Sequence, residues 1–80
     1  MIATLRGPVL ERDGSRVVLE AGGVGYELSV TAHTASRLPP PGGAAFLHVC
    51  ESTALYGGAT TLYGFLSHDE KAMFLLLREI

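Results

Sequence analysis

The stretch AAFLHVCESTALYGGATTLYGF, residues 44 to 65, decides the fold. It is predicted to form a long β-hairpin, with one arm from Ala44 to Tyr56, a tip at Gly57-Gly58 and a return arm from Ala59 to Phe65. Adjacent glycines between two β-prone runs favour a hairpin, because the tight turns that match strand twist need positive φ. Each arm is longer than the wall of a small barrel requires, so we expect the tip to project from the body.

The composition describes one small domain of weak net charge. The chain has 80 residues, of which 48% are hydrophobic and 18% are charged, and its formal net charge is −2. This length is near the lower limit for a self-sufficient core. The charge gives no sign of a broad basic surface, which counts against a free-standing DNA-binding domain but not against a fragment of one.

The sequence favours a soluble cytoplasmic protein without a membrane partner. A single cysteine, Cys50, excludes an intramolecular disulfide and fits a reducing compartment. No apolar run approaches the roughly 20 residues that cross a bilayer. The first residues, Met1 to Arg6, lack the basic and then apolar layout of a signal peptide.

Three strands are predicted before the hairpin. They span Ile2 to Glu11, Arg16 to Ala21 and Val24 to Val30, with turns at Asp13-Gly14 and Gly22-Gly23. The third strand alternates most cleanly, which predicts one buried face for Val24, Tyr26, Leu28 and Val30. Pro8 removes a backbone donor from the first strand, so an edge or a bulge is expected next to Gly7.

Two helices are predicted. Thr31 is expected to cap a short helix that carries Ala32, Ala35 and Leu38 and stops at the Pro39–Gly43 run. Further on, Ser67 and Glu70 have the spacing of a capping box. The apolar face of this second helix comprises Met73, Leu76, Leu77 and Ile80, with Phe74 beside it. Because the chain stops there, we expect residues 67–80 to open a truncated second domain, and residues 1–66 to form the first.

The order of these elements predicts an all-β fold. Five or six short strands, with a helix between the third and the fourth, are typical of the OB-fold, a small Greek-key barrel. An SH3-like barrel is the competing architecture. The position of the short helix favours the OB-fold.

No catalytic or metal site stands out. His48 and Cys50 share a strand face, but His33 and His68 are distant in sequence and a zinc site needs three or four ligands. Cys50 has no neighbouring oxyanion loop for nucleophilic catalysis, and the acidic residues are scattered. The Gly22–Gly25 run leads into a strand rather than a helix, so it predicts a turn and no phosphate loop. No cofactor is therefore expected.

Among the tyrosines, Tyr26 is expected in the core, and Tyr56 is the better candidate for stacking on bases.

Four motifs occur together in one order. They are Met1-Ile2-x-x-Leu5-Arg6-Gly7, Gly22-Gly23-Val24-Gly25-Tyr26-Glu27, Leu38-Pro39 followed by Gly42, and Leu62-Tyr63-Gly64-Phe65. With this set the chain resembles the N-terminal domain of the RuvA family, the subunit of the bacterial branch-migration machine that binds Holliday junctions. Asp69, Glu70 and Phe74 are similar to the start of that family's second domain.

The resemblance implies a function in DNA repair and recombination, within the SOS response to DNA damage. Family members form homotetramers that hold an open four-way junction on one face, and helix-hairpin-helix motifs of the second domain grip the phosphates. A third domain contacts RuvB, the ATP-driven helicase motor, and the RuvC resolvase is a further implied partner. The subunit itself would be non-catalytic. This chain carries only the barrel and at most the first helix of the second domain, so we expect it to bind junction DNA weakly by itself.

One departure concerns the hairpin tip. In the family this hairpin carries an acidic pin, usually an Arg-Glu-Asp run, at the junction crossover, where negative charge repels phosphates. The matching positions here are Tyr56, Gly57 and Gly58, followed by Ala59, and none of them is acidic. We expect these four residues to lie at the crossover by position and to act by shape. The alternative is a generic OB-fold module that binds single-stranded nucleic acid or a protein partner.

Overall fold

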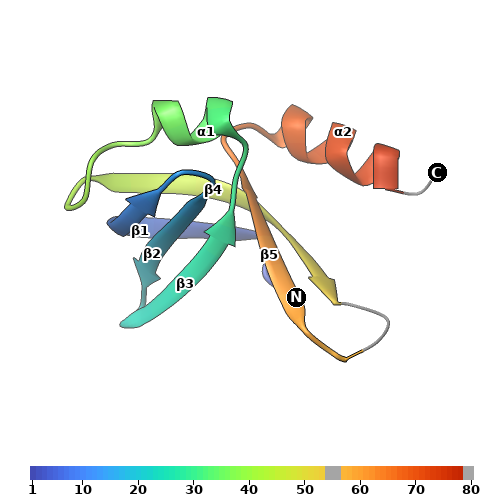
Figure 1. Cartoon of the computed structure of the whole chain (residues 1–80), viewed down its shortest axis with the longest axis horizontal. Coiled ribbons are helices and arrows are strands. Elements are labelled where there is room, and N and C mark those ends of the chain that lie inside the picture. Colours follow the sequence, from blue (N-terminus) through green and yellow to red (C-terminus); the bar gives the residue numbers. More distant parts are fainter. Residues whose placement is uncertain (54–56, 79–80) are drawn as a thin grey trace.

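The structure is a computed structural model that describes residues 1–53 and 57–78. Its strands are β1 (Thr4–Asp13), β2 (Arg16–Ala21), β3 (Val24–Ser29), β4 (Ala44–Thr53) and β5 (Thr60–Phe65). Its helices are α1 (Ala32–Arg37) and α2 (His68–Arg78). The five strands form a closed barrel in the order β1-β2-β3-β5-β4, as Figure 1 shows, which agrees with the predicted OB-fold.

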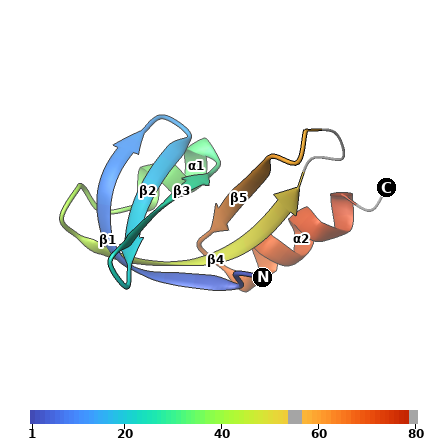
Figure 2. The same ribbon diagram turned by 90° about the horizontal axis from the view of Figure 1, so that it is seen from below.

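Strand β1 closes the barrel because its two halves pair with different strands. Its first half, Thr4–Pro8, pairs with β4, and its second half, Val9–Asp13, pairs with β2. Figure 2 shows β1 running beside β4 near the N-terminus and beside β2 toward its other end. The change of partner needs a sharp bend, and a bulge lies between Val9 and Glu11. The predicted irregularity in this strand is therefore confirmed, although the bulge lies two residues beyond Pro8.

Gly7 allows the bend. A Cβ built at Gly7 would lie 1.7 Å from the carbonyl oxygen of Glu20 on β2. No side chain fits at that distance, so glycine is required here for space alone.

The core fills the barrel and is closed by α1. The fully buried side chains include Val9, Val17, Leu19, Leu28, Leu47 and Val49. The Thr31 hydroxyl caps α1 by accepting a hydrogen bond of 3.1 Å from the Thr34 amide, as predicted. At the other end of α1, the Arg12 guanidinium donates to the carbonyl oxygens of Ala35 and Leu38 at 3.3 and 2.6 Å. This side chain therefore ties the helix to β1.

The structure corrects several predicted boundaries. Strand β1 begins at Thr4 and ends at Asp13, two residues later at each end than predicted. Strand β3 ends at Ser29, and Val24 is 50% exposed, because it lies at the open end of its strand. In α1 the buried positions are Thr34 and Ala35, and Ala32 is exposed.

The hairpin and the second helix also differ in detail. The described pairing of β4 with β5 ends at Thr53 and Thr60, and β5 begins one residue after the predicted Ala59. The predicted end of the first arm at Tyr56 lies outside the described residues. In α2 the Ser67 hydroxyl accepts a hydrogen bond from the Glu70 amide at 3.1 Å, which confirms the predicted cap. Ile80 lies outside the described residues.

We expect Gly7→Ala to destabilise the barrel by at least about 3 kcal/mol, because the new methyl group would overlap a backbone carbonyl that cannot move independently. Urea unfolding measures this change. Gly25→Ala is the matched control, since its Cβ would meet Val18 and Leu10 only at 3.5 and 3.7 Å, which are ordinary contacts. Equal losses for the two variants would contradict the steric role of Gly7.

We expect Thr34→Val to raise the free energy of unfolding by about 1 kcal/mol. The Thr34 side chain is fully buried, and its hydroxyl has no hydrogen-bond partner among the described residues. Valine has nearly the same shape and removes the unsatisfied group. Thr31→Val serves as the contrast, because it deletes the cap of α1 and should lower stability by about 1 kcal/mol. Thermal or urea unfolding that gives both variants the same sign would refute this assignment.

Candidate nucleic-acid interface

The outer part of the β4–β5 hairpin stands clear of the barrel. Pairing of β1 with β4 reaches only His48, and the Val49 amide adds one bond of 2.8 Å to the Ala3 carbonyl. Strand β5 contacts β3 only at Leu62 and Tyr63. Beyond these points the described residues of the two arms pair only with each other, and the arms extend past the other strands in Figure 1. The predicted projection of the hairpin is thus seen in its described residues.

The described tip residues are Gly57, Gly58 and Ala59, and all three are exposed. Gly57 and Gly58 have φ values of 87° and 66°, which side chains rarely adopt. A Cβ at either glycine would meet nothing within 4 Å, so the tip is open to a large neighbour. Tyr56, the fourth predicted site residue, lies outside the described residues.

The arms end in a polar pair just below the tip. The hydroxyls of Thr53 and Thr60 lie 3.2 Å apart on exposed, paired positions. Glu51 is the nearest acid along β4, and its Oε1 accepts a hydrogen bond of 3.0 Å from the Ile2 amide. That bond directs the carboxylate toward the N-terminus. The described tip residues are therefore uncharged, and what they offer a ligand is backbone and shape.

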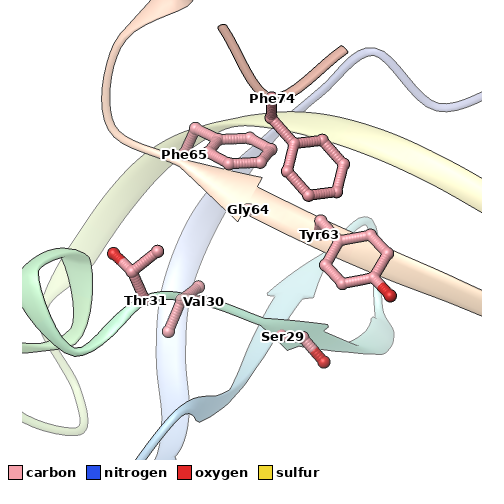
Figure 3. A pocket seen from close by; sticks show the side chains of 7 residues that line it. All are labelled: Ser29, Val30, Thr31, Tyr63, Gly64, Phe65 and Phe74. Carbon is pink, nitrogen blue, oxygen red and sulfur yellow. The ribbon is translucent and has the colours of Figure 1, made fainter. Parts of the chain in front are cut away.

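A cluster of three aromatic rings joins this hairpin to α2. The Phe74 ring lies 5.0 Å from that of Tyr63 and 5.1 Å from that of Phe65, between ring centroids. Figure 3 shows the three rings around Gly64, with Val30 and Thr31 opposite them across a cavity of about 230 Å³. Strand β5 therefore carries the tip at one end and holds α2 at the other.

Sequence reasoning missed this cluster as a unit. It used Tyr63 and Phe65 only as part of a family motif and placed Phe74 beside the apolar face of its helix. The usable signal was the pair of aromatic residues at alternate positions of β5, which put Tyr63 and Phe65 on one face. Tyr26 packs half-buried against the core, as expected.

The histidines and the cysteine do not assemble into a ligand set. Within the part of the chain that the structure describes, no three His, Cys, Asp or Glu residues could hold a metal ion together. On β4, His48 and Cys50 pair with Phe65 and Tyr63 of β5, and Cys50 is buried. The His48 and His68 rings meet edge to face at 6.0 Å. Neither described helix is long and apolar enough to cross a membrane.

These features define a class of protein, a small OB-type barrel that presents one bare β-hairpin. The model of the RuvA N-terminal domain matches residues 1–75, and the chain belongs to this family. The resemblance seen in the sequence motifs is thereby confirmed.

Curated relatives carry the name Holliday junction branch migration complex subunit RuvA. The protein of Solibacter usitatus is 43% identical over 92% of this chain. Those of Anaeromyxobacter sp. and a strain of Nitratidesulfovibrio vulgaris are 42% and 44% identical over 100% of it. The chain spans only 36%, 40% and 39% of the length of these three relatives.

We expect Phe74→Ala to release α2 from the barrel, since it removes the ring that contacts both Tyr63 and Phe65. The loss should be about 1–3 kcal/mol, because Phe74 is only half-buried. Amide hydrogen exchange of α2 measures it, with faster exchange in α2 and little change in β1 and β2. Leu76→Ala is the control, as Leu76 is 62% exposed. Unchanged exchange in Phe74→Ala would show that the ring cluster does not hold the helix.

Proposed function

We propose that this chain is the barrel domain of a subunit that binds four-way DNA junctions and supports branch migration driven by a RuvB motor. The observation that carries the proposal is the family match over residues 1–75, together with a bare hairpin that stands clear of the barrel. The relatives' printed name, a branch migration complex subunit, supports the same role.

In this proposal the hairpin tip lies where the strands of the junction cross. Residues Tyr56, Gly57, Gly58 and Ala59 are the proposed contact. Because the described tip residues are uncharged and open, they separate strands by occupying space rather than by repelling phosphates. Several copies around one axis bring their tips together, so the effect grows with symmetry. We therefore propose a homotetramer as the working form.

The phosphate contacts come mainly from elsewhere. Affinity for DNA depends on cations that displace counterions, and this chain has six Lys and Arg residues against eight Asp and Glu residues. We propose that a second domain, begun by α2, supplies these contacts. The described apolar face of α2 supports this, since Met73, Leu76 and Leu77 are 58%, 62% and 62% exposed. Met73 and Leu77 also border a groove of about 470 Å³. A helix of this kind is suited to packing against further helices.

The proposed subunit has no catalytic step of its own. The sequence contains no Gly-x-x-x-x-Gly-Lys-Ser/Thr loop for nucleotide phosphates. ATP hydrolysis then belongs to the RuvB motor, contacted through a third domain, and RuvC is a proposed further partner. The proposed location is the bacterial cytoplasm.

A chimera tests the proposal. Residues 1–80 replace the matching segment of the Anaeromyxobacter relative, and binding to a four-way junction is compared with binding to a linear duplex of equal length in a gel-shift assay. We expect the chimera to prefer the junction by about tenfold or more, and the 80-residue chain alone to bind both weakly. A chimera without junction preference would overturn the proposed function.

The same chimera tests how the tip acts. If the tip works by shape, Gly57→Glu with Gly58→Asp should change junction affinity by less than about threefold, about 0.6 kcal/mol. Gly57→Lys with Gly58→Lys is the control for charge of the opposite sign. A much larger change in junction affinity with the acidic pair than with the lysine pair would show that charge at the tip matters in this protein.

A further inference from the structure

The outer end of the hairpin is built from hydroxyl side chains. The last two described cross-strand pairs join Ser52 to Thr61 and Thr53 to Thr60. We call these four residues the hydroxyl collar, and it lies directly below the exposed residues of the tip. In Figure 2 the ends of β4 and β5 that carry the collar lie apart from β2 and β3. The collar is therefore open to a ligand that approaches the tip.

The collar begins where the barrel ends. Within the barrel, the inner face of β4 carries Leu47 and Val49, which are 0% and 1% exposed. Because side chains alternate along a strand, Thr53 lies on this same face, and both it and its partner Thr60 are exposed. The face thus changes from apolar to hydroxyl side chains where the described pairing with other strands has ended. A face of this kind is suited to water or to a polar ligand.

The threonine pair of the collar can donate a further hydrogen bond. The hydroxyl oxygens of Thr53 and Thr60 lie 3.2 Å apart, so one hydroxyl donates to the other. Each hydroxyl has one hydrogen, and the hydroxyl that accepts this bond keeps its own hydrogen for an outside acceptor. Accepting a hydrogen bond polarises that hydroxyl, which strengthens the bond that it donates in turn. The pair is therefore suited to a strong acceptor such as a charged oxygen.

No carboxylate opposes an anion at the collar. Within residues 50–53 and 57–61, which the structure describes, Glu51 is the one acidic residue, and there is no Lys or Arg. The Oε1 atom of Glu51 accepts a hydrogen bond of 3.0 Å from the Ile2 amide, which draws the carboxylate toward the N-terminus. What the described hairpin end offers an anion is therefore a set of neutral donors.

We propose that the hydroxyl collar donates hydrogen bonds to phosphate oxygens of the DNA strands that pass the hairpin at the crossover. This inference rests on the proposed function and names the chemical group that the hairpin contacts. Serine and threonine hydroxyls commonly bind phosphate oxygens in protein–DNA complexes, where they position the protein without reading the sequence. The tip then separates the strands by its bulk, while the collar holds them by neutral hydrogen bonds.

Two other occupants of the collar fit less well. Base edges are read best by side chains that form two hydrogen bonds in one plane, such as Arg, Asn and Gln. The collar and the described tip residues contain none of these. Protein partners bind mainly through aromatic or arginine anchors, and the described tip consists of Gly57, Gly58 and Ala59. A phosphate oxygen requires only a donor within reach, which the collar provides.

Two double variants of the chimera described above test the contact. Thr53→Val with Thr60→Val keeps the shape of the side chains and removes both hydroxyls, and valine is favoured in strands. Thr53→Ser with Thr60→Ser keeps both hydroxyls and removes the methyl groups. Thr4→Val is the control, because it removes an exposed hydroxyl of β1 at a position paired with His48, outside the collar. Junction affinity is measured by gel shift over a range of salt concentrations.

We expect the valine pair to weaken junction binding by at least about tenfold, and the serine pair and the control to stay within about threefold of the chimera. The slope of log affinity against log salt should not change, because neutral donors displace no counterions. A second junction carries methylphosphonate linkages at the crossover, which replace a charged oxygen of each phosphate by a methyl group. On this junction the valine pair should lose less than about threefold.

Four outcomes in a chimera that prefers junctions would overturn this inference alone. The valine pair binds like the chimera, or the serine pair loses as much as the valine pair, which would assign the effect to shape. The loss persists in full on the methylphosphonate junction, which would assign the contact to bases or sugars. The salt slope changes with the valine pair, which would assign the loss to displaced cations elsewhere. A chimera without junction preference would instead overturn the proposed function, and this inference with it.

Discussion

The structure depends on the contact between Gly7 of β1 and the Glu20 carbonyl of β2. Every strand of the closed barrel has two neighbours, but β1 pairs with them in succession, with β4 through its first half and with β2 through its second. The bend between the halves brings two backbones too close for any Cβ. One missing side chain thus allows the barrel to close, and the buried residues gather inside it.

That closure also determines where the hairpin can go. Since β1 leaves β4 at His48, and β3 meets β5 only at Leu62 and Tyr63, the remaining length of both arms lies outside the barrel. The hairpin is anchored at its base on one side by the Ala3 carbonyl and on the other by Phe74. A fixed base with a bare end is what a shape-based contact at a crossover needs.

The sequence predicted most where local chemistry determines structure. Strand β2 has turn glycines on both sides, and the caps of both helices rest on single hydroxyls, so these elements were found at or near their observed positions. The limits of β1 were missed because Gly7, Pro8 and the bulge interrupt its alternation. The contact between Arg6 and Phe46 could not be predicted from the sequence, because the two residues are forty positions apart and meet only through strand register. The hairpin site was located by family motifs, and its tip lacks the family's acids.

A hairpin tip without charge must be positioned more precisely at the junction than an acidic tip. An acidic tip repels phosphates over roughly a Debye length, about 8 Å at physiological salt, and so tolerates some looseness in its position. A tip without charge acts only where its atoms lie, because steric exclusion has no such range. The proposed role therefore demands a more rigid arrangement of copies around the junction. In the proposed homotetramer, this requirement falls on the contacts between neighbouring copies, which would hold each hairpin at a fixed distance from the axis. In the proposed assembly, precise packing between copies would take the place of charge at the tip.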